Sequence, residues 1–379
     1  MNLIPIAKPY LTNAEADEAS RVVLSGWVAQ GPKVKEFEEK FAEYTGARYA
    51  VAISNCTAAL HLSMIVSEIG AGDEVICPSM SYIATANSIR YTGATPVFAE
   101  VDPVNFNLDP EDAESKITSR TKAIMIAHQI GMPADIDAFK EICARHNIKL
   151  IEDAACASGS SYKGKKIGSH SELVCFSFHP RKVITTGEGG MITTSNEKLR
   201  DRLKLLRQHA MASSSIDRHN TSSALSEDHV ELGYNYRMTD IQAAVGIVQL
   251  SRLDEIVMER RNIAANFIRN LSDIKWLMMP EEKEGFFTNY QSFAVRVHND
   301  SPVSRDELML RLGEKGISTR RGVMTAHRET AYKDLYSKLS LPVSESASDN
   351  SLMLPIFVPM LKDDIGKIIE RVRGIFRET

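Results

Sequence analysis

Residues 149–155, Lys-Leu-Ile-Glu-Asp-Ala-Ala, form a short apolar run that ends in two carboxylates and then in small residues. Residues 122–128, Lys-Ala-Ile-Met-Ile-Ala-His, form a similar run, and residues 135–146 between the two carry apolar side chains at helical spacing. A strand, a helix and a strand in this order are typical of a parallel sheet that is covered by helices. These two runs therefore predict an α/β fold.

Similar runs continue the pattern in both directions along the chain. Together they predict a large domain with a mainly parallel sheet of seven strands, at residues 49–54, 74–77, 96–101, 122–128, 149–152, 174–178 and 191–194. Before them, Gly31-Pro32-Lys33 predicts the start of a helix, in which Val34, Phe37 and Phe41 form one face.

The second half of the chain has a different pattern. A long helical stretch, 239–271, is expected to link two domains, and residues 292–297, 305–315 and 364–376 predict a strand and two helices. We therefore expect a large domain over 1–250 and a small C-terminal α+β domain over 251–379. The serine-rich segment 211–226 is expected to be a mobile loop.

Composition limits the classes of function. The 379 residues include 45 Lys plus Arg and 49 Asp plus Glu, so the net charge of −4 does not favour binding to nucleic acid. The longest apolar runs are much shorter than the ~20 residues of a membrane span, and the N-terminus does not resemble a signal peptide. A cytoplasmic protein is expected. The five cysteines include no CxxC pair, so we expect buried reduced thiols and no metal site.

Three motifs carry residues with possible chemistry. In residues 54–60, a strand ends and a helix begins with small polar residues, which could bind a phosphate or could simply cap the helix. Asp153 follows a strand, where it could face a ligand or could form a turn. Lys182 follows the strand at 174–178 and precedes a glycine-rich turn at 187–190; desolvation would lower its pKa, although most such lysines lie on the surface.

The order of these three motifs is more informative than any one of them. Pyridoxal phosphate needs a helix start for its phosphate, a deprotonated lysine amine for its aldehyde and a carboxylate for its ring nitrogen. Residues 54–60, Lys182 and Asp153 supply these three groups. The sequence therefore predicts a pyridoxal phosphate enzyme.

At this level of detail the chain resembles the DegT-type nucleotide-sugar aminotransferases, which belong to the fold type I pyridoxal phosphate enzymes. The matching stretches are spread over most of the chain, at residues 25–32, 54–61, 72–75, 152–155, 177–182, 185–190 and 233–238. The resemblance implies the fold type I architecture: a mainly parallel seven-stranded sheet in a large domain, with a small C-terminal α+β domain.

The resemblance also implies roles for single residues. Lys182 would bond to the cofactor and move the proton, and Asp153 would pair with the ring nitrogen. The phosphate would be held by Thr57, Ala58 and Ser177, and by Asn235 of a neighbouring subunit in a homodimer with a shared active site. Tyr82 would stack on the ring, while His327 and Arg320 would contact the substrate.

Some of these residues allow another interpretation, and two positions differ from the residues that are usual in the family. Tyr82 could be a core residue, Asn235 a turn residue, and Glu188 either a buried partner or a catalytic group. Cys56 stands where the family usually has glycine. Cys156 stands where it has Gln or His, which would contact the cofactor's ring oxygen; a thiol is a weak partner for that contact.

The implied reaction is transamination in two halves. L-Glutamate would give its amino group to the cofactor, and a keto carbon of a nucleotide-linked sugar would then receive it. Some relatives carry His at the position of Lys182 and are dehydratases, so the lysine favours amino transfer. We expect C4 of a 4-keto-6-deoxy sugar, in surface polysaccharide or glycan synthesis; a 3-keto sugar, or a non-catalytic regulatory protein, is the alternative.

Overall fold

A seven-stranded sheet forms the centre of the protein. The computed structural model describes residues 3–211 and 228–378. The strand order is β1-β9-β8-β5-β4-β2-β3, and β9 alone runs antiparallel to its neighbours, so the expected mainly parallel sheet is confirmed. Its strands are β1 (Tyr49–Ile53), β2 (Glu74–Pro78), β3 (Thr95–Ala99), β4 (Thr121–Ala127), β5 (Lys149–Asp153), β8 (Leu173–Ser177) and β9 (Gly190–Thr194).

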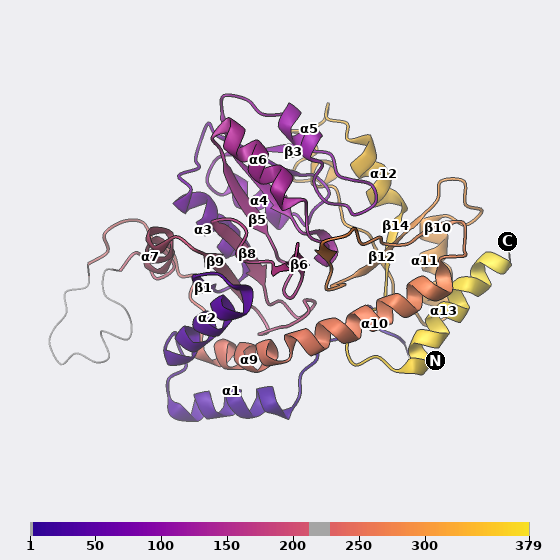
Figure 1. Cartoon of the computed structure of the whole chain (residues 1–379), viewed down its shortest axis with the longest axis horizontal. Coiled ribbons are helices and arrows are strands. Elements are labelled where there is room, and N and C mark those ends of the chain that lie inside the picture. The colour runs from indigo at the N-terminus through magenta and orange to yellow at the C-terminus, as the bar shows by residue number, and fades with distance from the viewer. Residues whose placement is uncertain (1–2, 212–227, 379) are drawn as a thin grey trace.

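Helices cover both faces of this sheet because its side chains alternate between two apolar clusters (Figure 1). On β5, for example, Ile151 belongs to the cluster beneath α3 (Cys56–Val66), α4 (Ala84–Arg90) and α7 (Glu197–Leu206). Residues of the opposite face pack with α2 (Pro32–Thr45), α6 (Ile136–His146) and α9 (Asp240–Ser251). Two further helices are α1 (Asn13–Ser25) and α5 (Pro110–Ser115), with a short 3-10 turn, η1 (Gln129–Gly131).

The C-terminal part builds a second sheet, which has the order β10-β12-β14-β13. Its elements are α10 (Leu253–Leu271), β10 (Leu277–Met278), β12 (Phe293–Val297), α11 (Arg305–Glu314), β13 (Arg320–Arg321), η2 (Ala326–Arg328), α12 (Pro342–Asn350), β14 (Ser351–Leu354) and α13 (Lys362–Arg377). A three-stranded sheet, β11-β6-β7, lies beside the large sheet and comprises β6 (Ser161–Tyr162), β7 (Lys165–Lys166) and β11 (Phe286–Phe287).

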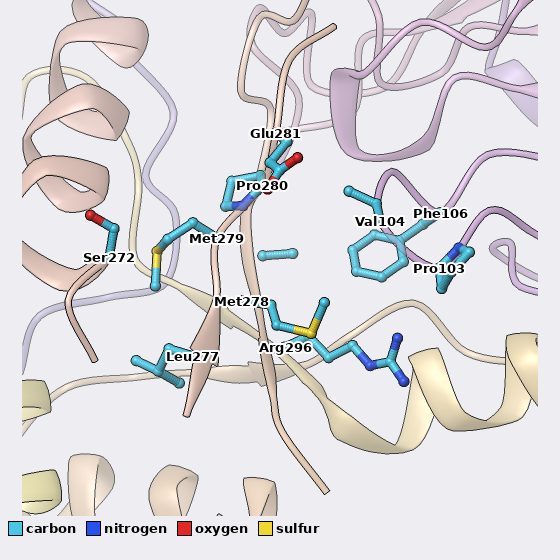
Figure 2. A pocket seen from close by; sticks show the side chains of 11 residues that line it. Pro103, Val104, Phe106, Ser272, Leu277, Met278, Met279, Pro280, Glu281 and Arg296 are labelled. Carbon is cyan, nitrogen blue, oxygen red and sulfur yellow. The ribbon is translucent and has the colours of Figure 1, made fainter. Parts of the chain in front are cut away.

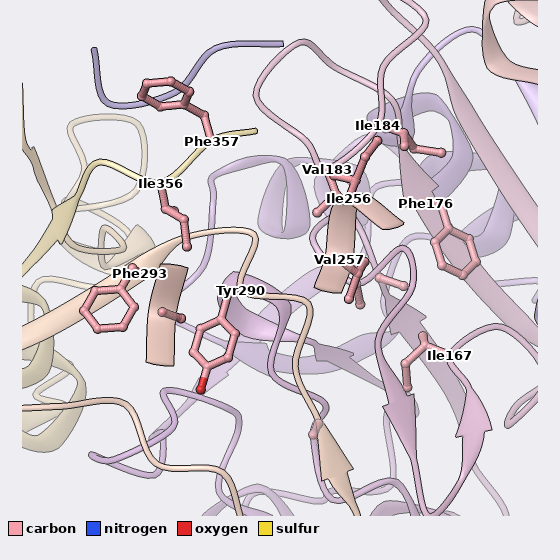
Figure 3. Packing of buried hydrophobic residues seen from close by; sticks show 14 of the residues in the cluster. Ile167, Phe176, Val183, Ile184, Ile256, Val257, Tyr290, Phe293, Ile356 and Phe357 are labelled. Atoms are coloured by element: carbon pink, nitrogen blue, oxygen red, sulfur yellow. The ribbon is translucent and has the colours of Figure 1, made fainter. Parts of the chain in front are cut away.

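One apolar cluster continues from the large sheet into the C-terminal sheet. Figure 3 shows Phe176, Ile256 and Val257 on one side of this cluster and Phe293 and Ile356 on the other. Ile256 and Val257 come from α10, which runs diagonally from the large sheet toward α13 in Figure 1. The C-terminal sheet therefore packs against the same hydrophobic core as the large sheet.

The sequence missed or misplaced some elements. The expected helix over 239–271 is wrong as a single element, because Arg252 leaves helical geometry and separates α9 from α10. The sequence did not predict the three-stranded sheet, whose strands are two residues long. Except for Met211, the segment 211–226 lies outside the described residues. The division at residue 250 stays a prediction.

None of the described helices combines the length and the apolar character that a membrane span requires.

Gly190 lies where β1, β8 and the start of α3 come close together. It is paired with Ile53 at the end of β1 and with Ser177 at the end of β8. A Cβ atom at Gly190 would lie 2.6 Å from the carbonyl carbon of Asn55, directly before α3. The absence of a side chain therefore lets the start of α3 approach the end of β8.

Replacing Gly190 by Ala is expected to lower the free energy of unfolding by about 2 kcal/mol or more, because a backbone segment must move to admit the methyl group. Chemical denaturation measures this change. Gly313→Ala is the control: Gly313 lies in α11 with nothing within 4 Å of an added Cβ, so this variant should keep or slightly raise stability. Equal stability of the two variants would contradict the close approach.

Candidate active site

The predicted carboxylate lies at the carboxyl end of β5, in the middle of the large sheet. Asp153 is 8% exposed. Its Oδ2 accepts a hydrogen bond from Thr85 Oγ1 at 2.8 Å, and its Oδ1 accepts one from the backbone N–H of Ala155 at 3.1 Å. Both oxygens are therefore held, and the side chain does more than close a turn.

The start of α3 lies close to the end of β8. Asn55 caps this helix, because its side chain accepts a hydrogen bond from Ala58 N at 2.8 Å. The capping interpretation is thus correct for Asn55. This bond occupies the N–H of Ala58. Because the first N–H groups of a helix have no partner within the helix, Thr57 lies where an anion can bind. The phosphate contact of Ala58 stays a prediction. Ser177 ends β8 beside this helix start, across from Gly190.

The loop that carries Lys182 connects β8 to β9 and is held at several points. Phe178 N donates to Gly189 O at 2.9 Å, and Thr186 N donates to Phe178 O at 3.0 Å. Helix α9 fixes the same loop, because Thr185 N donates to Gln249 Oε1 at 3.1 Å. These bonds close the loop at its base and leave Lys182 at its turn.

Lys182 points to Cys156, with 3.2 Å between Nζ and Sγ. Burial disfavours the charged amine, but Cys156, Cys56 and Asp153 favour it more strongly, so the pKa of Lys182 is raised. Desolvation lowers this pKa as expected, but the neighbouring groups outweigh it and the net shift is upward. The sequence could not show it, because the net shift depends on neighbours from two other segments, 153–156 and the start of α3.

Cys156 is itself held by a residue of the C-terminal part. Asn289, which is fully buried, donates through Nδ2 to the carbonyl oxygens of Cys156 and Ser158, both at 2.8 Å. Gly131 permits this contact, since a Cβ atom there would lie 1.9 Å from Asn289 Oδ1. Sequence reasoning missed Asn289, and no local motif marks it.

Several expected site residues lie on the surface. Tyr82 is 72% exposed, so the alternative that it is a core residue is wrong. Asn235 is also exposed, in a segment bridged to Gln208. Glu188 is exposed, which excludes the buried-partner interpretation. The ring-stacking role of Tyr82 and the phosphate contact of Asn235 stay predictions.

Of the two residues expected to contact the substrate, one is buried and the other is exposed. His327 is 4% exposed; its Nδ1 lies 2.6 Å from Ser79 Oγ and its Nε2 lies 3.1 Å from Glu345 Oε1. Because both ring nitrogens are engaged, this arrangement does not support direct substrate contact by His327. Arg320 is exposed on β13. Their roles stay predictions.

A cavity of about 250 Å³ lies apart from these residues. Pro103, Val104 and Phe106 face Met278 and Arg296 across it (Figure 2). None of the expected site residues lines this cavity. It is therefore not the site that the sequence predicts.

Comparison with known proteins places this geometry in a family. Residues 9–373 match the model of the DegT/DnrJ/EryC1/StrS aminotransferase family. The chain is also similar to the aminotransferase TlmJ from Streptoalloteichus hindustanus, with 34% identity over 98% of each chain and a TM-score of 0.91.

Two further solved structures cover nearly the whole chain. PseC from Helicobacter pylori, an aminotransferase involved in the biosynthesis of pseudoaminic acid, is 25% identical over 100% of each chain, with a TM-score of 0.93. Spr1654 from Streptococcus pneumoniae is 28% identical over 99% of each chain. Its PMP-form has a TM-score of 0.93 and its PLP-form a TM-score of 0.92. The expected cofactor, pyridoxal phosphate, is thereby confirmed.

The described residues fit this cofactor. A buried carboxylate ends β5, an amine lies within electrostatic reach of it, and Gly190 leaves the start of α3 next to Ser177. Asp153 would hold the ring nitrogen, and Lys182 would bond to the aldehyde carbon. The phosphate would be held by Thr57, Ala58 and Ser177.

Replacing Cys156 by Ala is expected to lower the pKa of Lys182, because Cys156 contributes most among the groups that favour the charged amine. In the protein freed of cofactor, more of the amine is then unprotonated at a given pH below that pKa. Labelling of Lys182 by an amine-reactive reagent should become several-fold faster, as measured by mass spectrometry over a pH series. The control is Cys143→Ala, since the Cys143 thiol contacts the carbonyl of Lys149 instead. Identical pH profiles for the wild type and Cys156→Ala would contradict the contact.

Proposed function

The chain belongs to the DegT/DnrJ/EryC1/StrS aminotransferase family and is a pyridoxal phosphate-dependent sugar aminotransferase, and we propose that it aminates C4 of a nucleotide-linked 4-keto-6-deoxy sugar. L-Glutamate is the proposed amino donor. The product would enter surface polysaccharide or glycan synthesis, and the reaction would take place in the cytoplasm.

One observation supports the amino-transfer chemistry of this proposal: Lys182 and Asp153, 29 positions apart in the sequence, lie within electrostatic reach of each other and of Cys56 at the start of α3. Bound pyridoxal phosphate supplies an electron sink that stabilises negative charge on the substrate carbon. Asp153, fixed through both oxygens, would keep a proton on the ring nitrogen. The amine of Lys182 would take a proton from one carbon and return it to another.

The cofactor and the sugar nucleotide are both anionic, and the chain as a whole has a net charge of −4. The positive potential that binds them must therefore come from groups close to the site. The first turn of α3 would supply it through the backbone N–H of Thr57, together with the hydroxyl of Ser177. Ala58 would take part if the phosphate replaced the Asn55 side chain at its N–H. For the sugar nucleotide, Arg320 is an exposed cation, and it is the residue we propose for the substrate.

The surface around Asn235 supports a homodimer in which each subunit completes the other's site. Asn235 is exposed, and so are Leu232 at 79% and Tyr91 at 57%. Nearby, the rings of Tyr234 and Tyr236 stack at 5.1 Å and pack against His61. We propose that this surface meets a second copy and that Asn235 reaches the partner's phosphate site.

Replacing Lys182 by Ala is expected to abolish transamination, because no other amine would take over both the bond to the cofactor and the proton transfer. In the wild type, borohydride should fix the cofactor to the peptide that contains Lys182, as detected by absorbance and mass spectrometry. The exposed Lys35→Ala is the control and should be fully active. Retained turnover in Lys182→Ala would disprove the assignment.

The same variant tests the shared site. Mixed with Asn235→Ala under conditions that exchange subunits, Lys182→Ala forms hybrid dimers in which one of the two sites keeps both Lys182 and Asn235. Activity should then exceed that of either variant alone. A mixture that gains nothing, or a protein that sediments as a monomer, would argue against the shared site.

A panel of UDP-, dTDP- and GDP-linked keto sugars tests the substrate. With L-glutamate as donor, turnover is expected for 4-keto-6-deoxy sugars, and NMR should place the new amino group on C4. Amination of C3 instead would support the alternative 3-keto substrate. A purified protein that takes up cofactor but aminates no keto sugar would reject the proposed substrate class.

A further inference from the structure

We propose that Thr85 is a positioning residue for the cofactor: it holds the Asp153 carboxylate and ties it to the turn that carries Tyr82. This inference rests on the proposed function, because it assumes that Asp153 meets the ring nitrogen and that Tyr82 meets the ring face. Thr85 itself would touch neither the substrate nor the cofactor.

The hydrogen bonds around Thr85 have a defined direction. Thr85 lies in the first turn of α4 and is 1% exposed. Its Oγ1 lies 2.8 Å from Asp153 Oδ2 and 2.8 Å from Ser81 Oγ. A hydroxyl has a single proton, and the carboxylate can only accept, so Thr85 donates to Asp153 and Ser81 donates to Thr85. The result is a relay from Ser81 through Thr85 to Asp153.

This relay fixes the plane of the carboxylate. Ala155 N holds Oδ1, and without Thr85 the other oxygen, Oδ2, could swing about the last side-chain bond. Hydrogen bonds to an ionised acceptor are about twice as strong as bonds between neutral groups. Moreover, the oxygens of a side chain that is 8% exposed have few water molecules to bond with and need hydrogen-bond donors from the protein. Thr85 therefore sets the direction in which Asp153 can meet the cofactor.

The same residue shapes the turn around Tyr82. Ser81 and Thr85 flank Tyr82 and are joined through their side chains, and Thr85 N donates to Tyr82 O at 3.1 Å. Because Tyr82 is 72% exposed, core packing does not hold its ring, and the turn determines where it lies. A single hydroxyl thus links the residue for the ring nitrogen with the residue for the ring face.

If Thr85 stabilised only its own turn, its hydroxyl would donate to a carbonyl nearby in the sequence. Threonine hydroxyls in helices commonly bond to the carbonyl three or four residues earlier, and Thr92, in the turn after α4, makes the same kind of bond with Ile89 O at 2.9 Å. Thr85 instead donates to a residue 68 positions away, on the central strand β5. Its hydroxyl therefore connects α4 to the functional edge of the sheet.

Thr85→Val tests the proposal because it keeps the shape of the side chain and removes the donor. Pyridoxal phosphate is titrated into the cofactor-free protein and followed by absorbance and by its induced circular dichroism. We expect about tenfold weaker cofactor binding, an altered dichroism signal and a lower kcat with little change in the KM for L-glutamate. Thr85→Ser should restore all three. Thr92→Val is the matched control and should bind cofactor as the wild type does.

The decisive comparison repeats Thr85→Val in an Asp153→Ala background. If Thr85 acts through Asp153, the second substitution should weaken cofactor binding by no further factor. Equal losses in both backgrounds, or a Thr85→Val protein that binds cofactor like the wild type, would overturn the inference. If Thr85→Val does not fold, Ser81→Ala removes the preceding donor and should cause a smaller loss in the same direction; unchanged binding in that variant would overturn it too.

The outcome also separates this inference from the proposed function. A wild-type protein that takes up cofactor and transaminates, next to an unaffected Thr85→Val, would reject the role of Thr85 alone. A wild-type protein without transaminase activity would reject the proposed function, whatever the variants do.

Discussion

The close approach of three backbone segments at Gly190 is the constraint on which the site depends. Because β9 lies between β1 and β8, Gly190 faces Ile53 on one side and Ser177 on the other. Helix α3 leaves β1 at this level, and the Lys182 loop leaves β8 at the same level. The missing side chain thus lets the start of α3 and the Lys182 loop occupy neighbouring positions. A larger residue at position 190 would push the start of α3 away from the end of β8.

Strand alternation then decides which of two adjacent carboxylates serves the site. Glu152 and Asp153 point to opposite faces of β5. Glu152 is fully buried, and its Oε2 lies 2.9 Å from His128 Nε2; Ala134 N donates to His128 Nδ1, so His128 donates to Glu152 through Nε2. Burial opposes ionisation of Glu152, yet the bond from His128 outweighs it and lowers the pKa. One carboxylate therefore ties β5 to β4, and the other remains at the edge that faces a ligand.

The sequence revealed what depends on local periodicity and chain order. Alternating apolar runs predicted all seven strands to within about two residues, and the order of three motifs predicted the cofactor. It could not reveal contacts between segments that are remote in the chain. Thr85, Asn289 and the raised pKa of Lys182 all depend on such contacts. The break at Arg252 was missed because the apolar pattern of α9 continues into α10 without proline or glycine at the junction.

The C-terminal part contributes to the surroundings of Lys182 through hydrogen bonds from its side chains to backbone carbonyls. Arg260 on α10 is buried, which lowers its pKa to about 10, and it donates to the carbonyl oxygens of Tyr290, Gln291 and Ile356. These bonds fix the segment that carries Asn289, which in turn holds the carbonyl of Cys156. Gln291 Nε2 donates to Arg181 O at 3.0 Å, directly before Lys182. A buried cation more than 70 residues away in sequence thus helps to determine where the Lys182 loop lies, so the large sheet alone does not set the surroundings of Lys182.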